Sequence, residues 1–110
     1  MEPIQIVGIK ELDDKERSTV NKLANRYYEK IIRDINNEGS ITIVIKTHGK
    51  GGKQRKYGVH IKLSAPTRIF ESTKAIDWDL ARTMHKAFND MEKQIQHHLH
   101  TDSQHNKPYE

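Results

Sequence analysis

The spacing of the apolar residues changes twice along this chain, and each change marks a different kind of secondary structure. Across residues 20–35, apolar side chains recur every three or four positions, which is the spacing of one face of an α-helix. Across residues 41–63 they occupy every second position, as in strands with one buried face. The helical spacing returns across residues 80–99. The chain therefore has to combine helices and strands.

Short local signals predict where the first elements begin and end. Residues 4–9 form a β-rich run after a proline, which indicates a first strand. Asp13 and Glu16 have the spacing of a capping box, in which each side chain accepts a hydrogen bond from the other residue's backbone amide. A helix is predicted to begin there and to run to about residue 35. Gly39 suits the left-handed conformation that often follows a helix.

Three further strands are predicted after this helix. Residues 41–46 and 57–64 alternate and are joined by residues 48–56, which are rich in glycine and cations. This arrangement indicates a hairpin whose ladder can extend into the ends of the connector. Pro66 cannot donate to a ladder and suits a strand start, so residues 67–73 are predicted as the fourth strand.

A second amphipathic helix completes the pattern. Asp77 or Asp79 can cap its beginning, and the apolar stripe predicts that it runs to about His100. Trp78, just before the stripe, is predicted as an anchor at the rim of the core. Residues 101–110 are polar without periodicity and are predicted to form a tail.

The order strand, helix, three strands, helix predicts an α+β fold for residues 1–100, in a single domain. We expect a four-stranded sheet with two helices packed on one face, similar to a double-stranded-RNA-binding domain. Only 34% of the residues are hydrophobic, so the core should be small. The alternation places Thr42, Lys46, His60 and Lys62 on the face that the helices leave uncovered.

Charge is distributed unevenly. The formal net charge is +4, yet residues 39–70 contain no acidic residue and seven cations. Such a segment attracts phosphates, and we expect structured RNA as the partner. With few aromatic residues, binding through shape and phosphate contacts is favoured over base readout. The cations of the segment are Lys46, Lys50, Lys53, Arg55, Lys56, Lys62 and Arg68.

Other chemistries find little support. The chain has no cysteine, which excludes disulfides, thiolate metal sites and thiol nucleophiles. Residues 49–53 lack the spacing of a phosphate-binding loop, so no nucleotide cofactor is expected. No carboxylate set completes a metal site with the histidines near the C-terminus, and neither a metal nor a small-molecule substrate is predicted. These histidines are His97, His98, His100 and His105.

Membrane association is not expected either. No window approaches the roughly 18 apolar residues that a membrane span needs. The first residues lack the basic and apolar regions of a signal peptide. We therefore expect a cytoplasmic protein.

Two segments resemble a known family. Residues 4–8 read Ile-Gln-Ile-Val-Gly, and residues 79–98 carry a helix pattern similar to that of the same family. Together with the element order, they resemble the ribosome hibernation-promoting factor family, which are ribosome-associated inhibitors of translation. The residues of the helix that carry the resemblance are Asp79, Met84, Phe88, Met91, Glu92, Lys93, Gln94, Ile95 and His98.

The resemblance implies a protein that docks on the small ribosomal subunit, in the channel of mRNA and tRNA, and keeps an idle ribosome from initiating. It implies the short form, without a dimerising domain. Lys93 matches a basic helix position of the family, while Lys62 and Arg68 occupy places where such proteins present cations to ribosomal RNA. Two positions depart from the pattern: Ala81 stands where the family has an aromatic residue, and Asp90 where it has a cation.

Three functions remain open at this point. The first is a ribosome-binding translation inhibitor, which would not be an enzyme. The second is a general double-stranded RNA-binding module. The third is a small RNA-processing enzyme that uses His60 as acid or base. For the first, the predicted RNA contacts are Lys46, Lys50, Lys53, Arg55, Lys56, His60, Lys62, Arg68 and Lys93.

Overall fold

The computed structural model describes residues 3–35, 38–48, 56–66 and 68–105. It shows an α+β fold in the predicted order of strand, helix, three strands and helix, with one additional 3-10 turn. Within the described residues, neither helix offers a stretch that is long and apolar enough to cross a membrane. The elements are β1 (Ile4–Val7), η1 (Ile9–Glu11), α1 (Asp14–Ile35), β2 (Ser40–His48), β3 (Lys56–Ser64), β4 (Ile69–Asp77) and α2 (Leu80–His105).

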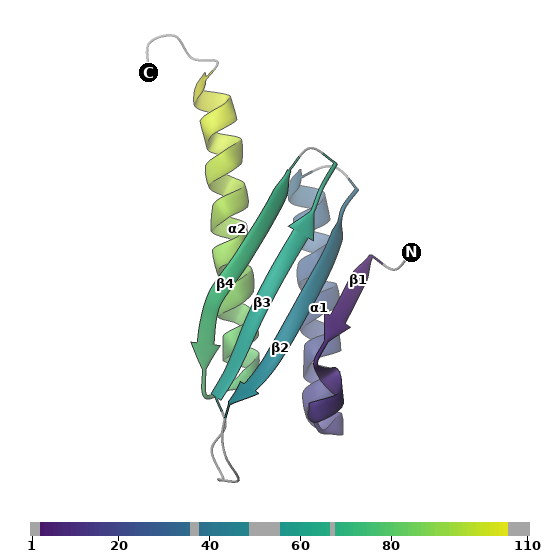
Figure 1. Ribbon diagram of the computed structural model, residues 1–110. Helices are drawn as coiled ribbons and strands as arrows, with labels where there is room; N and C mark the ends of the chain where they lie inside the picture. Colours follow the sequence, from purple (N-terminus) through teal and green to yellow (C-terminus); the bar gives the residue numbers. More distant parts are fainter. Residues whose placement is uncertain (1–2, 36–37, 49–55, 67, 106–110) are drawn as a thin grey trace.

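The four strands form one mixed sheet in the order β1-β2-β3-β4. β1 is parallel to β2, with Ile4 opposite Ile41, and the other two pairs are antiparallel. Parallel neighbours need a crossover connection, and α1 provides it. Both helices lie on the same side of the sheet, α2 behind β3 and β4 and α1 towards β1 (Figure 1). The predicted architecture is therefore confirmed, and one side of the sheet is left open.

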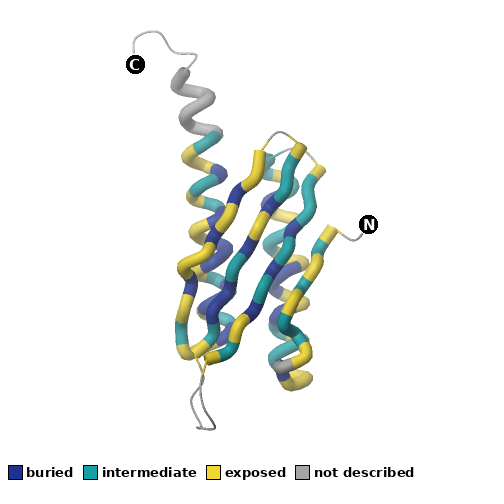
Figure 2. The backbone as a smooth tube through the Cα atoms, in the orientation of Figure 1, coloured by how far each residue is buried: buried dark blue, intermediate teal, exposed yellow. Residues whose placement is uncertain are grey.

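The core lies between the sheet and the two helices. The register aligns Ile43 of β2 with Ile61 of β3, and both side chains are fully buried. Buried positions alternate with more accessible ones along these strands, as Figure 2 shows. Phe88 of α2 is the largest of the fully buried side chains. The helices add the buried residues Val20, Leu23, Ala24, Ile31, Leu80, Met84, Ala87, Met91 and Ile95.

The two helices contact each other through aromatic and charged side chains. The rings of Tyr27 and Phe88 are stacked, with centroids 4.5 Å apart and an interplanar angle of 2°. The Tyr27 hydroxyl shares a hydrogen bond of 2.5 Å with Nδ1 of His85. Burial raises the pKa of the Tyr27 phenol, and the nearby Glu92 carboxylate raises it further. Glu92 also pairs with Lys30 at 3.0 Å, which joins α1 to α2 and raises the pKa of Lys30.

Both predicted helix caps are present. The amide of Asp13 donates to Oε1 of Glu16 at 3.1 Å, and the amide of Glu16 donates to Oδ1 of Asp13 at 2.7 Å. This is the predicted capping box, and α1 begins directly after Asp13. The Tyr57 hydroxyl of β3 also donates to Glu16 and so ties the sheet to this cap. Of the two candidates for α2, Asp79 is the cap, because its Oδ1 accepts from the amide of Arg82 at 3.0 Å.

Gly8 ends β1 at Val7, two residues before the end of the predicted β-rich run. Its φ is +93°, in the left-handed region that glycine adopts without strain. A Cβ atom at this position would lie 2.2 Å from the carbonyl oxygen of Ile45. The backbone of residue 8 therefore lies directly against β2, and no other residue fits there.

One predicted backbone conformation and two predicted boundaries were wrong. Gly39 does not adopt the left-handed conformation; its carbonyl instead accepts a hydrogen bond of 2.9 Å from the Tyr28 hydroxyl. β4 spans Ile69–Asp77 and not residues 67–73, because a register shift between Val59 and Ile61 lets the ladder continue. α2 extends to His105, five residues past the predicted end, since residues 101–105 contain no glycine or proline to stop it.

Candidate nucleic-acid interface

The open face is the side of the sheet that the helices leave uncovered. Its residues alternate with the buried core residues of β2 and β3, and the register aligns them in cross-strand pairs. Thr42 lies opposite Lys62, and Val44 lies opposite His60. The predicted placement of these side chains on one face is confirmed. The described members of the open face on β2 and β3 are Ser40, Thr42, Val44, Lys46, His48, Lys56, Gly58, His60, Lys62 and Ser64.

The lysines of the open face are not neutralised. Lys46, Lys56 and Lys62 are exposed. Glu71 of β4 is aligned with Lys62, yet among the described residues no carboxylate oxygen lies within 4.0 Å of the three ammonium groups. The ion pairs that the described residues form lie elsewhere: Lys30 with Glu92, and both Arg82 and Lys86 with Asp77. The open face therefore keeps a positive field that attracts phosphates.

At the hairpin end of the open face, the surface is recessed at Gly58, which has no side chain. This glycine is aligned with Lys46 on β2 and with Ile76 on β4. A Cβ atom at residue 58 would lie 3.6 Å from Nε2 of His48 and 4.0 Å from Cγ1 of Ile76. The imidazole of His48 and the side chain of Ile76 thus flank the glycine. A cation, an imidazole and an apolar side chain therefore meet at one end of the sheet.

Trp78 adds an aromatic ring to this end, and the prediction that it anchors the rim of the core was wrong. Its side chain is 56% exposed, and the Nζ atom of Lys56 lies over the indole, 5.0 Å from the ring centroid. The residue lies between the last residue of β4 and the cap of α2, so it falls outside the apolar stripe of the helix. That position off the stripe was the sequence signal for exposure.

The other predicted contacts do not join the described part of the open face. Lys50, Lys53 and Arg55 lie outside the described residues. Arg68 precedes β4, and its guanidinium carbon lies 5.5 Å from the ring centroid of Phe70, which is buried. Lys93 is exposed on α2, in the helical layer on the opposite side of the sheet. The sequence predicts Arg68 as a contact from its charge, whereas Lys93 is implied only by the family resemblance, as a basic position of the helix.

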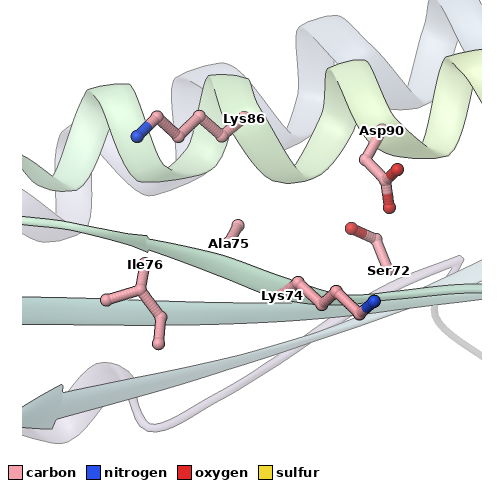
Figure 3. Close-up of a pocket in the computed structure, with 6 residues that line it drawn as sticks. All are labelled: Ser72, Lys74, Ala75, Ile76, Lys86 and Asp90. Atoms are coloured by element: carbon pink, nitrogen blue, oxygen red, sulfur yellow. The ribbon is translucent and has the colours of Figure 1, made fainter.

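A pocket of about 260 Å³ lies between β4 and α2 (Figure 3). The Ser72 hydroxyl is buried there and has no hydrogen-bond partner among the described residues. In Figure 3 the Asp90 carboxylate points towards this hydroxyl. Lys86, at the other end, is paired with Asp77. Charges of both signs line this pocket; its lining residues are Ser72, Lys74, Ala75, Ile76, Lys86 and Asp90.

The described histidines bear on metal binding and on acid–base chemistry. Within the described part of the chain, no three histidine or carboxylate side chains are grouped so that they could hold a metal ion. His98, one of the C-terminal histidines, lies edge-on to Phe70 with ring centroids 5.8 Å apart. His60 is partly exposed in the middle of the open face, opposite Val44. It lies in the same face as Lys62, where an imidazole can contact a phosphate.

Comparisons with known proteins leave the family open. No protein-family model matches the chain, and a search of the curated proteins returns no match. The resemblance to the hibernation-promoting factors therefore rests on the residues quoted above.

Proposed function

We propose that this chain is a cytoplasmic ribosome-binding protein that inhibits translation by occupying the mRNA–tRNA channel of the small subunit. It binds ribosomal RNA through the open face and the cationic hairpin. Its action is steric, because mRNA and tRNA cannot enter a channel that the protein fills. No bond is made or broken, and no cofactor is needed.

One observation carries the RNA-binding part of this proposal. Lys46, Lys56 and Lys62 are exposed on the open face without an ion-pair partner among the described residues. Phosphates that replace water and counterions around such lysines release the counterions, which favours binding. The helices cover the opposite face, so the sheet is available as a docking surface.

The ribosomal partner is supported by the resemblance of two segments. Residues 4–8 end in Gly8, whose backbone is left-handed and lies against β2. The fold therefore requires a glycine at this position of the segment. Phe88 and Met91, from the helical segment, are fully buried core residues. The similarity thus includes positions that build the fold, and the element order agrees with it.

Sedimentation with separated ribosomal subunits tests the proposal. The purified protein is mixed with small or large subunits, with and without an excess of duplex RNA. We expect it to sediment with small subunits alone and to resist the duplex. Lys46→Ala with Lys62→Ala should abolish most of this binding. The matched control is Lys22→Ala with Arg26→Ala, which removes the same charge from exposed positions of α1.

Two outcomes would contradict the ribosomal proposal. If duplex RNA readily displaces the protein from small subunits, the chain is a general double-stranded RNA-binding module. Helices on one face of a small basic sheet serve that role too. If the RNA is cleaved, and His60→Ala stops cleavage but keeps binding, the chain is an RNA-processing enzyme.

A further inference from the structure

Trp78 is an exposed aromatic ring at the edge of a cationic surface. Trp78 is 56% exposed, and Ile76, two residues before it in the chain, is 51% exposed. Ile76 is aligned with Gly58, on the side of the sheet where His48 lies. β4 ends at Asp77, and Trp78 follows it in a bend. The contact between the indole and Lys56, a member of the open face, places the ring at the edge of that face.

The backbone on both sides of Trp78 is held in place. Its amide donates a hydrogen bond of 2.6 Å to Oδ1 of Asp77, and Oδ2 of the same carboxylate lies 2.7 Å from Nζ of Lys86. On the other side, the Asp79 carbonyl accepts a hydrogen bond of 2.7 Å from the Thr83 hydroxyl, which is fully buried. A ring on an anchored backbone loses less conformational entropy when it binds a ligand.

The combination of a lysine with an exposed indole fits one class of ligand. Proteins that bind single-stranded nucleic acid stack unpaired bases on aromatic rings and hold the backbone with cations. Paired bases inside a duplex have no free ring face to offer. Resting on the proposed function, we propose that Trp78 stacks on an unpaired base of the RNA that crosses the open face. Lys56 and Lys46 contact the phosphates beside that base.

Trp78 is the single tryptophan of the chain, so its fluorescence reports on the indole directly. The protein is titrated with a ten-nucleotide single-stranded RNA and, separately, with a long duplex in which nearly every base is paired. Stacking on a base should quench the emission at saturation with the single strand and leave it nearly unchanged with the duplex. Equal quenching by both RNAs, or binding of the single strand without quenching, would overturn the inference.

Variants of Trp78 test whether the ring contributes to affinity. Trp78→Ala should weaken binding of the single strand about 5- to 150-fold, the range expected for loss of one stacked base. Trp78→Phe should restore most of the affinity, whereas Trp78→Leu, apolar but without a π face, should not. Full affinity in the leucine variant would show that Trp78 makes a merely apolar contact and would overturn the inference.

This inference and the proposed function fail in different ways. If Trp78→Ala binds single-stranded RNA as the natural chain does while Lys46→Ala with Lys62→Ala loses small-subunit binding, the stacking inference is wrong and the proposed function stands. If the lysine variant retains full small-subunit binding, the proposed interface is wrong, whatever Trp78 does. Unchanged helical circular dichroism in each variant confirms that the exposed substitutions leave the fold intact.

Discussion

Lys86 of α2 holds the carboxylate of Asp77 at the end of β4, with Nζ 2.7 Å from Oδ2. The same carboxylate accepts from the amide of Trp78 at 2.6 Å. A single side chain therefore joins the sheet to the second helix and orients the residue between them. Asp77 faces α2, while the ring of the adjacent Trp78 is exposed and contacts Lys56 of β3.

This contact gives the fold a pH dependence at acid pH. The hydrogen bond from Lys86, and then that from the Trp78 amide, lower the pKa of Asp77 below its usual value. A carboxyl with a lowered folded-state pKa stabilises the fold above its ordinary pKa of about 3.9, and the contribution disappears as the pH falls through the folded-state value. Asp77→Asn should therefore lower the free energy of unfolding at pH 7, and the difference should shrink below about pH 4.

Denaturant unfolding of the natural chain and of Asp77→Asn at pH 7, 5, 4 and 2.5 gives this difference directly. Asp34→Asn is a suitable control, because Asp34 lies on α1, away from Asp77. A difference that is as large at pH 2.5 as at pH 7 would show that the ionised carboxylate contributes nothing.

From the backbone conformation of Gly8 and its close contact with β2, we expect that one added methyl group strongly lowers the stability of the fold. Gly8→Ala places a Cβ in the left-handed region and 2.2 Å from the Ile45 carbonyl oxygen, so β1 has to move away from β2. We expect a loss of at least about 2 kcal/mol in the free energy of unfolding. Gly58→Ala is the matched control: its Cβ meets His48 at 3.6 Å, an ordinary contact, and should change stability by less than about 1 kcal/mol. Equal effects in thermal unfolding would contradict this interpretation.

Features fixed by neighbouring residues could be predicted from the sequence. The capping box of Asp13 and Glu16 involves two residues three positions apart, and both of its hydrogen bonds are present. The alternation that buries Ile43 and leaves Lys62 exposed is also local, since it follows from the two-residue period of a strand. The element order, and hence the fold class, followed from these periods.

Features that depend on distant residues could not be predicted. The extension of β4 depends on a register shift against β3, which has no signature in the sequence of β4 itself. The place of Trp78 off the apolar stripe is a sequence signal for its exposure, but its contact with Lys56 of β3 joins residues far apart in the chain and could not be predicted. Arg68 looks like a strand cation, but its guanidinium packs over the buried ring of Phe70.

The cations of the connector between β2 and β3 are predicted to increase the affinity for the small subunit without contributing to the stability of the fold. Lys50, Lys53 and Arg55 belong to the acid-free segment of residues 39–70. Their joint replacement by alanine should weaken small-subunit binding at least tenfold at physiological salt, because each removes one possible phosphate contact. The melting temperature should change little, as expected of surface substitutions. Lys22→Ala, Arg26→Ala and Arg33→Ala together remove the same charge from exposed positions of α1 and should leave binding nearly unchanged.

If both triple variants lose the same affinity for the small subunit, binding depends on the net charge of the protein and not on where the charges lie. A large fall in the melting temperature of the hairpin variant would show that the segment contributes to the fold itself.

The salt dependence of small-subunit binding shows whether the open face contacts phosphates. In a plot of log affinity against log salt concentration, each phosphate contact contributes about −0.7 to −0.9 to the slope. Lys46→Ala with Lys62→Ala should therefore reduce the magnitude of the slope by about 1.4 to 1.8, while Lys22→Ala with Arg26→Ala leaves it unchanged. If the open-face variant binds with the slope and affinity of the natural chain, the open face does not contact RNA.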